Sequence, residues 1–214
     1  MRFKHCIFDI DGTLVDTEAT GTHSLVSTVK FLMGKDMSYD EAYSYFGIES
    51  IKVGPLLGYD DAEHFLEEWE SRFVQMRHLM VPFDGVLDVV RDVKKAGCHT
   101  GIITSRSHRE MESDPDLETI LADIDISVCA SDTVRPKPYP DPVWKYLEIF
   151  ESRTGTRVDR NECIYIGDMR NDFKCARDAG ICFALADWHR RGLQDLPVDF
   201  SFTDASGLRS ILGL

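Results

Sequence analysis

Residues 4–18 read KHCIFDIDGTLVDTE, an apolar run followed by a cluster of acidic and small residues. The apolar run CIF at residues 6–8 predicts a buried strand, and two aspartates, Asp9 and Asp11, follow it at once. Gly12 and Thr13 come directly after them. Paired carboxylates are costly at the end of a buried strand, so they indicate a function rather than a simple turn. The end of this predicted strand is therefore the first candidate functional site.

The composition sets the class of protein and excludes some partners. The chain has 214 residues and a formal net charge of -13, which argues against binding nucleic acid or an anionic membrane. A small anionic substrate stays possible, because a bound metal can reverse the local field. We expect a small phosphorylated metabolite as partner and a monomer or weak dimer as the assembly.

The cysteines and the apolar runs predict the compartment. The six cysteines form no CxxC pair and lie mostly in apolar runs, so we interpret them as reduced core residues of a cytoplasmic protein. No apolar run approaches membrane-spanning length. The first residues lead straight into a strand, and we expect no signal peptide.

Apolar runs alternate with segments of helical periodicity through most of the chain. The strand candidates are Phe3–Phe8, Thr100–Thr104, Ile126–Ala130, Cys163–Ile166 and Cys182–Ala186. Helices are predicted over Gly85–Gly97, over the stripe Val143, Leu147 and Phe150, and over Asn171–Ala179. This alternation predicts an α/β fold with a doubly wound, mostly parallel, Rossmann-like sheet.

One segment, residues 17–80, carries no strand signal. Leu25, Val29, Leu32 and Met33 repeat at helical spacing, and so do Phe65, Trp69, Phe73, Met76 and Met80, with a shorter helix predicted over Ser38–Phe46. We predict a helical cap over residues 17–80, inserted into a catalytic core of residues 1–16 and 81–214. The aromatic stripe is interpreted as the packing face of this cap.

Polar residues follow the other predicted strands. Thr104, Ser105 and Arg106 follow the second strand, Lys137 lies in the loop after the third, and Asp168 and Asp172 follow the fourth. Ligands of open parallel sheets bind at the carboxyl ends of the strands, so these groups should converge with Asp9 and Asp11. Clustered carboxylates suit Mg²⁺, and a lysine with a hydroxyl can hold a phosphoryl group.

Four motifs carry a resemblance to a known family. FDIDGTLVDTE resembles the first motif of the haloacid dehalogenase superfamily, GIITS the second, PKPYPDP the lysine-bearing third, and IGDMRNDFKCARDAG the fourth. They occur in family order and span nearly the whole chain. The helical insertion resembles the cap of the phosphoglycolate phosphatase and β-phosphoglucomutase branch.

The resemblance implies a role for each residue. Asp9 would be the nucleophile, and Asp11 the acid that protonates the leaving oxygen and then the base that activates water. Thr104 and Lys137 would hold the phosphoryl oxygens, with Gly12 and Ser105 beside the phosphate. Asp9, Asp168 and the backbone carbonyl of Asp11 would bind Mg²⁺, with Asp172 as a direct or water-mediated partner.

Several of these residues also have a plainer interpretation. Thr104 could cap the following helix, and Lys137 could be a solvated loop lysine. Asp172 could be a first-turn acid favoured by the helix dipole. For Arg106, an exposed loop arginine is the commoner case, and no histidine group with metal-ligand spacing is expected.

The motifs favour a phosphatase over the other chemistries of the fold. Asp11 points to phosphoryl transfer from an oxygen leaving group, because dehalogenases and phosphonatases of the family lack this second aspartate. The leading prediction is a phosphoglycolate-phosphatase-like, Mg²⁺-dependent phosphatase with an aspartyl-phosphate intermediate. A β-phosphoglucomutase-like mutase and a catalytically quiet phosphate- or metal-binding protein are the alternatives. The mutase is disfavoured because the cap loop Phe46–Gly58 has no arginine. Phosphoglycolate, a sugar phosphate, a nucleotide and pyrophosphate all remain possible substrates.

Overall fold

The computed structural model describes residues 2–112, 114, 117–190, 193 and 195–214. It divides into two compact units: residues 1–14 with 82–214, here called the α/β unit, and residues 15–81, here called the helical unit. The chain enters the helical unit through β2 (Val15–Asp16) and leaves it through β3 (Val81–Pro82). These two short strands pair with each other.

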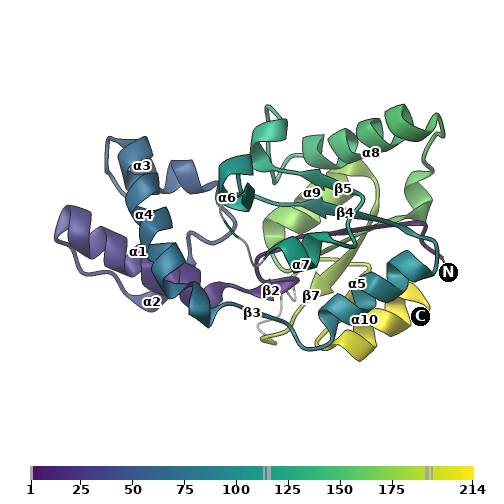
Figure 1. The fold of residues 1–214 in the computed structure, drawn as a ribbon, viewed down its shortest axis with the longest axis horizontal. Helices are drawn as coiled ribbons and strands as arrows, with labels where there is room; N and C mark the ends of the chain where they lie inside the picture. The colour runs from purple at the N-terminus through teal and green to yellow at the C-terminus, as the bar shows by residue number, and fades with distance from the viewer. Residues whose placement is uncertain (1, 113, 115–116, 191–192, 194) are drawn as a thin grey trace. The chain divides into compact units, whose positions relative to one another are not determined.

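A six-stranded sheet with the order β5-β4-β1-β6-β7-β8 forms the centre of the α/β unit (Figure 1). The strands are β1 (His5–Phe8), β4 (His99–Ile103), β5 (Ile126–Val128), β6 (Cys163–Gly167), β7 (Cys182–Ala186) and β8 (Phe200–Phe202). Every neighbouring pair is parallel. Ile7 of β1 lies opposite Gly101 on one side and Tyr165 on the other, so β1 occupies the middle of the sheet.

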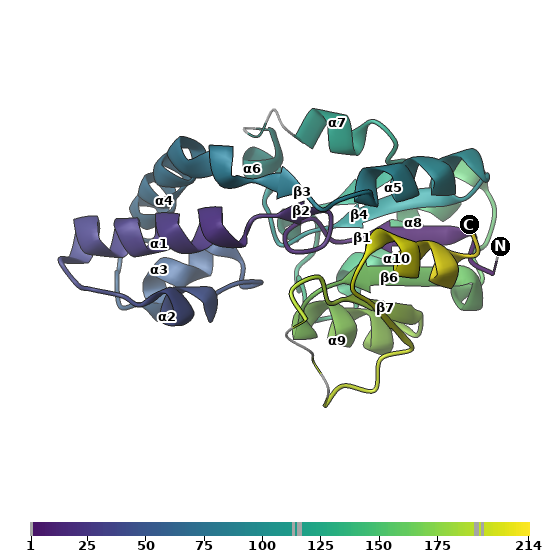
Figure 2. The same ribbon diagram turned by 90° about the horizontal axis from the view of Figure 1, so that it is seen from below.

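Helices cover both faces of this sheet, which confirms the predicted doubly wound fold. The helix α5 (Val86–Lys95) packs on β4 and against α10 (Ala205–Leu212), and Figure 2 shows the two side by side. On the other face α8 (Asp141–Thr154) packs against α9 (Arg170–Ala179). Shorter helices, α6 (His108–Glu112) and α7 (Leu117–Leu121), lie between β4 and β5 in the chain.

The core of the α/β unit lies where the central strands meet α8 and α9. Ile7, Tyr146, Tyr165, Phe173 and Phe183 are among its buried members. β1 and β6 are buried along their whole length, and β4 is buried after its first residue, as expected of the central strands of a parallel sheet. This burial fixes the strand ends, and with them the side chains that follow.

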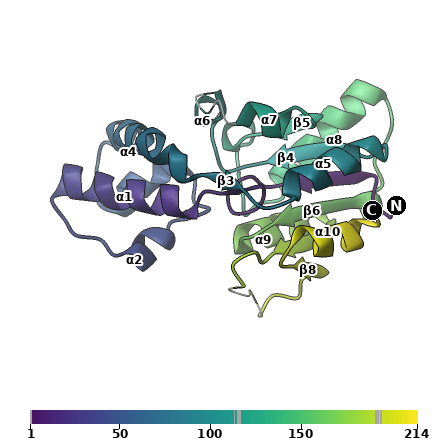
Figure 3. The ribbon, with the colours of Figure 1, turned by 60° about the horizontal axis from the view of Figure 1, so that its bottom comes forward.

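The helical unit contains α1 (Glu18–Met33), α2 (Tyr39–Tyr43), α3 (Val53–Leu56) and α4 (Ala62–Met76). The long helices α1 and α4 lie side by side (Figure 3). Residues from all four helices form a cluster of buried residues: Leu25, Val29, Ala42, Val53 and Phe65. The Trp69 indole donates a 2.9 Å hydrogen bond to Ser24 Oγ, which satisfies the polar end of the predicted aromatic stripe.

Some sequence predictions were wrong in detail. The helix predicted to reach Met80 ends at Met76 and continues as a 3₁₀ turn over Arg77–Leu79. The first strand begins at His5 rather than Phe3. The strand β8 and the helix α10 were not predicted, and neither was the short helix α3.

Two further observations concern the whole chain. All six cysteines are free thiols. Among the residues that the structure describes, none of the helices has the length and apolar content that a membrane crossing would need.

Candidate active site

The site lies at the carboxyl ends of β1, β4 and β6, in the α/β unit. The Asp9 N–H still donates to the Ile166 carbonyl at 2.9 Å, and the Thr104 N–H donates to the Val128 carbonyl at 3.1 Å. The backbone of both residues is therefore held by the neighbouring strand. Their side chains project from fixed positions at the sheet edge, where the parallel fold places a ligand.

Lys137 joins two of the predicted carboxylates. Its Nζ lies 2.7 Å from Asp9 Oδ1 and 2.7 Å from Asp172 Oδ1. The Lys137 side chain is only 5% exposed, so the alternative of a solvated loop lysine was wrong. Burial opposes the charge on the ammonium, but the carboxylates of Asp172 and Asp9 outweigh it and raise the pKa of Lys137. The lysine stays charged and aims at the Asp9 carboxylate.

Asp172 has several partners in the first turn of α9. Its Oδ2 accepts a hydrogen bond from the Met169 N–H at 3.0 Å, and its Oδ1 accepts one from the Tyr165 hydroxyl at 3.0 Å. With Lys137 also on Oδ1, both carboxylate oxygens are engaged. The role of a first-turn acid at the helix start is thus present, and the same side chain also fixes Lys137.

Three carboxylates form a group that fits a hard divalent cation. Oxygens of Asp9, Asp168 and Asp172 lie within 4.8 Å of one another. Burial raises the pKa of Asp9 to about 7, with Asp172 and Asp11 adding to the shift and Lys137 opposing it. Burial also raises the pKa of Asp168 well above its usual value, and Asp172 and Asp9 add to it. A cation would relieve this repulsion, and oxygen ligands of this kind suit Mg²⁺.

Gly12 keeps the space beside Asp168 open. Its φ is 82°, a left-handed value that favours glycine, and a Cβ at this position would overlap the Asp168 carboxylate. Thr13 Oγ1 lies 3.4 Å from Asp168 Oδ1 and donates to it. The glycine after the paired aspartates is therefore needed so that β1 and β6 can present their carboxylates together.

Asp11 is bound by Arg106, a residue that the sequence predicted to be exposed. The Arg106 guanidinium donates to both carboxylate oxygens of Asp11, from Nε at 2.8 Å and from Nη2 at 2.7 Å. Its Nη1 donates to Asp114 at 2.8 Å. The Arg106 side chain is 9% exposed, so the expected exposed loop arginine is a buried one.

Thr104 and Ser105 occupy the loop that leads to Arg106. Thr104 is buried, and its hydroxyl accepts a 3.1 Å hydrogen bond from the Arg106 N–H. This is the local capping role that the sequence left open, although the residue capped is in the loop rather than in a helix. Ser105 is partly buried next to it.

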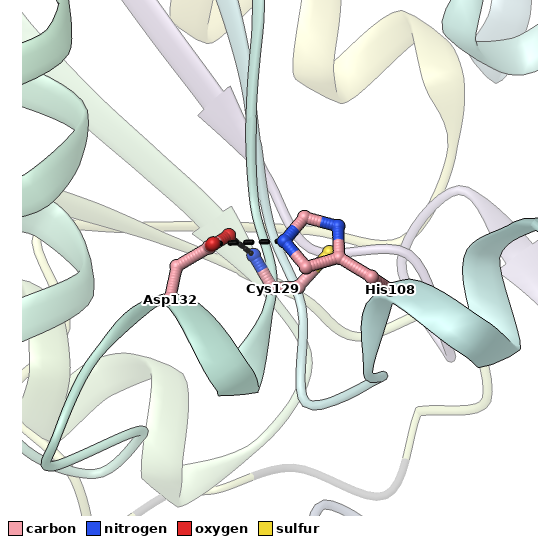
Figure 4. Close-up of side chains that lie close together, drawn as sticks. All are labelled: His108, Cys129 and Asp132. Carbon is pink, nitrogen blue, oxygen red and sulfur yellow. Dashed lines mark hydrogen bonds and ion pairs between the residues drawn. The ribbon is translucent and has the colours of Figure 1, made fainter.

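A second group of possible ligands lies beside β5, and the sequence spacing did not reveal it. His108 Nε2 lies 2.8 Å from Asp132 Oδ1, and the other oxygen of Asp132 accepts the Cys129 N–H at 2.7 Å (Figure 4). The ligand atoms of the three residues lie within 4.8 Å of one another. Burial raises the pKa of the Cys129 thiol to about 12, and Asp132 adds to the shift. Asp132 is the last residue of the 3₁₀ turn Ala130–Asp132, and its bond from the Cys129 N–H is part of the capping box that starts this turn.

An aromatic pair supports the loop after Asp11. The Trp188 indole N–H donates to the Thr13 carbonyl at 3.0 Å, and its ring stacks on Phe83 with centroids 4.6 Å apart. Trp188 belongs to the stretch ADWHRRG that follows β7. The last two residues of this stretch, Arg191 and Gly192, lie outside the described residues.

A family model identifies the family of the chain, and solved structures share its fold. The family model of haloacid dehalogenase-like hydrolases matches residues 6–186. The pyrophosphatase PpaX of Bacillus cereus is 24% identical over 217 residues, which cover 99% of this chain and 97% of the relative. A predicted phosphoglycolate phosphatase of Haemophilus somnus superposes with a TM-score of 0.78 at 17% identity, covering 99% of each chain. CbbY of Rhodobacter sphaeroides, solved with phosphate, gives 0.76 at 17% identity over 94% of each chain.

Proposed function

Because the chain belongs to the family of haloacid dehalogenase-like hydrolases, we propose that it is a Mg²⁺-dependent phosphatase acting on a small phosphomonoester through an aspartyl-phosphate intermediate. The observation that carries the proposal is the pairing of Asp9 with a buried lysine at 2.7 Å, at the sheet edge where Asp11 also follows β1 and Asp168 follows the neighbouring β6. A carboxylate next to a fixed cation is placed to meet a phosphoryl group.

The side chains divide the chemistry between them. Asp9 attacks phosphorus, and the Lys137 ammonium holds phosphoryl oxygens against it. Asp11 gives a proton to the leaving oxygen and later takes one from the water that hydrolyses the aspartyl phosphate. Thr104 lies at the next strand end, where its hydroxyl can approach the same oxygens.

The carboxylate group defines which residues would hold the metal. Asp9, Asp168 and the backbone carbonyl of Asp11 would bind Mg²⁺, with Asp172 acting directly or through water. The bound ion would neutralise charge on the phosphoryl oxygens. In the described structure Asp172 already contacts Lys137 and Tyr165, which supports an indirect role for this residue.

The alternative of a sugar phosphate mutase has less support. Such a mutase needs a cation in the loop Phe46–Gly58 to grip a second phosphate, and the cation in this loop is Lys52. Its ammonium is paired with Glu49 at 2.5 Å. A catalytically quiet protein is disfavoured by the complete set of carboxylates.

The partner and location belong to the same proposal. The substrate class is a small phosphorylated metabolite, and the names of the relatives direct attention to phosphoglycolate and pyrophosphate. Nucleic acid and membranes are disfavoured as partners by the net charge of -13. Buried, free thiols support a cytoplasmic location, and a monomer or weak dimer is proposed.

The experiment is a screen of phosphate release across p-nitrophenyl phosphate, phosphoglycolate, sugar phosphates, nucleotides and pyrophosphate, each with Mg²⁺ and with a chelator. Turnover that requires Mg²⁺ and vanishes in Asp9→Asn supports the proposal. Conversion of β-glucose 1-phosphate to its 6-phosphate isomer would favour the mutase. Phosphate release that persists in Asp9→Asn would rule out the aspartyl-phosphate route.

Asp11→Asn tests the division of labour between the two aspartates. General acid catalysis contributes roughly 10²- to 10⁴-fold, so this variant should lose most of its rate on alkyl phosphates. With p-nitrophenyl phosphate, whose leaving group needs no proton, it should give a burst of product and then stall. Rapid-quench kinetics with trapping of the acyl phosphate measures both effects. A variant without burst or leaving-group dependence would mean that Asp11 is not the proton-transfer group.

A further inference from the structure

Arg106 lies just after the second motif, GIITS, and contacts Asp11, the proposed proton-transfer group. Two of its guanidinium nitrogens donate to the two carboxylate oxygens of Asp11, at 2.8 and 2.7 Å. The third nitrogen donates to Asp114, whose side chain is 8% exposed. Although burial opposes it, the charge of Asp11 raises the pKa of Arg106, so the guanidinium stays charged.

The geometry of this contact is that of a fork. A planar guanidinium that binds both oxygens of a carboxylate fixes the plane of that carboxylate as well as its distance. With only 9% of the arginine side chain exposed, water competes little for these hydrogen bonds. Asp11 is therefore held in one orientation, with its negative charge stabilised.

The backbone of Arg106 is anchored independently of its side chain. Its N–H donates to Thr104 Oγ1 at 3.1 Å, and its carbonyl accepts the Ala130 N–H at 3.0 Å. The first bond lies within the loop after β4, and the second connects this loop to the turn that follows β5. The position of the Arg106 backbone is therefore supported by bonds other than those of the guanidinium, two of whose nitrogens bind Asp11.

We propose that Arg106 is the positioning residue that holds Asp11 for proton transfer, an inference that rests on the proposed phosphatase function. As an Asp9 oxygen bonds to phosphorus, the bond from phosphorus to the leaving oxygen breaks, the Asp11 carboxyl gives its proton to that oxygen, and Asp11 becomes a carboxylate. The Nε and Nη2 groups of Arg106 each donate a hydrogen bond to one oxygen of this carboxylate. Asp11 then takes a proton from water as the water oxygen bonds to phosphorus, and Asp9 is released as a carboxylate.

A double-mutant cycle tests the proposal, with Arg106→Gln, Asp11→Asn and the double variant. In the wild-type background Arg106→Gln should lower kcat on p-nitrophenyl phosphate by about 10- to 100-fold, part of the range for general acid-base catalysis. In the Asp11→Asn background it should add about twofold or less, because residues that act through one another are not additive. Arg106→Lys keeps the charge but lacks the fork, so it should recover only part of the rate.

A second readout separates positioning from support of the fold. In single-turnover experiments, Arg106→Gln should lower the rate constant of aspartyl-phosphate formation more for an alkyl phosphate than for p-nitrophenyl phosphate. Asp114→Ala is the matched control, because it removes the acceptor of the Arg106 Nη1 bond but not the acceptors on Asp11; its leaving-group dependence should match that of the wild type. If Arg106→Gln does not fold, the same two measurements on Arg106→Lys decide the question.

The possible outcomes separate the two proposals. Suppose that the wild type is active and that Arg106→Gln lowers kcat by the same factor in the wild-type and Asp11→Asn backgrounds. This result would overturn the positioning role and leave the proposed phosphatase function intact. Equal losses on alkyl and aryl phosphates would overturn it as well. A wild type that releases no phosphate from any substrate of the screen would fail the proposed function, and the role of Arg106 would fall with it.

Discussion

Lys137 is a buried, charged residue whose position is fixed by two carboxylates. Its ammonium has Asp9 on one side and Asp172 on the other, each at 2.7 Å. A buried cation with a single partner would move toward that partner alone, whereas two partners fix its position. Tyr165 and the Met169 N–H in turn hold Asp172. The carboxylate after β1 thus faces a lysine that side chains from β6 and α9 have aligned.

This arrangement predicts different effects for the two acids after β6. Asp168→Asn should weaken Mg²⁺ binding more than Asp172→Asn, because Asp168 follows the strand directly and Asp172 is already engaged by Lys137. Asp172→Asn should instead lower turnover at saturating Mg²⁺. Metal titration by calorimetry together with kcat measures both effects. Equal or reversed losses of affinity would show that Asp172 is a direct ligand.

His5 gives the protein a sensitivity to acid far from the proposed chemistry. Its ring lies against Phe150, and its Nδ1 is 3.1 Å from the Tyr146 hydroxyl. Burial lowers the pKa of His5 to about 4, and His99 adds to the shift. Between about pH 6.5 and pH 4 the unfolded chain takes up a proton that folded His5 does not, so stability falls as the pH falls through this window.

His5→Gln should therefore flatten the pH dependence of the free energy of unfolding between pH 6.5 and 4. The pH-dependent part of the unfolding free energy that this variant removes is about 3 kcal/mol, because the pKa of His5 falls from 6.5 to about 4 and each pH unit corresponds to 1.36 kcal/mol. Urea unfolding at several pH values measures it. His64→Gln, at an exposed position of α4, is the control. An unchanged slope in His5→Gln would show that other groups cause the acid sensitivity.

Helix starts show how single side chains set the limits of elements. Ser38, Asp61 and Asp204 each accept a backbone N–H three residues further on, at the beginnings of α2, α4 and α10. These N–H groups have no partner inside the helix, so the side chain supplies the missing acceptor. The start of α4 at Asp61 follows from this cap.

Asp61→Ala should destabilise the protein by about 1 kcal/mol, the usual cost of losing an N-cap. Its Oδ1 accepts the His64 N–H at 3.0 Å, and alanine cannot replace that bond. Chemical denaturation measures the change. The neighbouring Asp60→Ala is a matched control, since it removes the same charge from an exposed position. Equal losses in the two variants would assign the effect to charge rather than to capping.

At the scale of elements the sequence predicted five strands of the six-stranded sheet, among them those that end at the site, and missed β8. Runs such as CIYIG at residues 163–167 are wholly apolar because both faces are buried, and that pattern is visible in one sequence. The strand β8 reads FSF and is only three residues long, too short for a periodicity signal. The helix α3 contains Gly54 and Pro55, which usually interrupt helices.

The same limit applies to the site. Residues that directly follow a strand, such as Asp9 and Asp168, could be placed from the sequence because strand ends converge. The burial of Arg106 could not, since it depends on Asp114 reaching back over a loop of charged residues. One signal for Arg106 was visible in the sequence: it follows the hydroxyl residues Thr104 and Ser105 at the end of a predicted strand.

For the whole molecule, the helical unit has a hydrophobic cluster drawn entirely from residues 15–81. Phe65 is fully buried in it and fits against Gly54, where a Cβ would overlap the phenyl ring. The α/β unit has its cluster around Tyr165 and Phe183. Each unit therefore has a source of stability that does not involve the other.

Phe65→Ala should cost about 3–5 kcal/mol, as for other buried aromatic truncations. The loss of hydrogen-exchange protection should be concentrated in residues 15–81. Phe183→Ala is the counterpart in the α/β unit and should expose amides of residues 82–214. Hydrogen exchange read by mass spectrometry resolves the two regions. If Phe65→Ala lowered protection equally in both regions, the units would unfold as one.

The contact of Trp188 with the loop after Asp11 also provides an optical probe. The chain has three tryptophans, and Trp188 is bound to the Thr13 carbonyl and stacked on Phe83. Indole fluorescence responds to such hydrogen bonding and stacking. With Trp69 and Trp144 replaced by phenylalanine, the remaining emission would arise next to the loop that begins with the paired aspartates. Binding at that loop could then be followed in real time by stopped-flow fluorescence, without a chemical label.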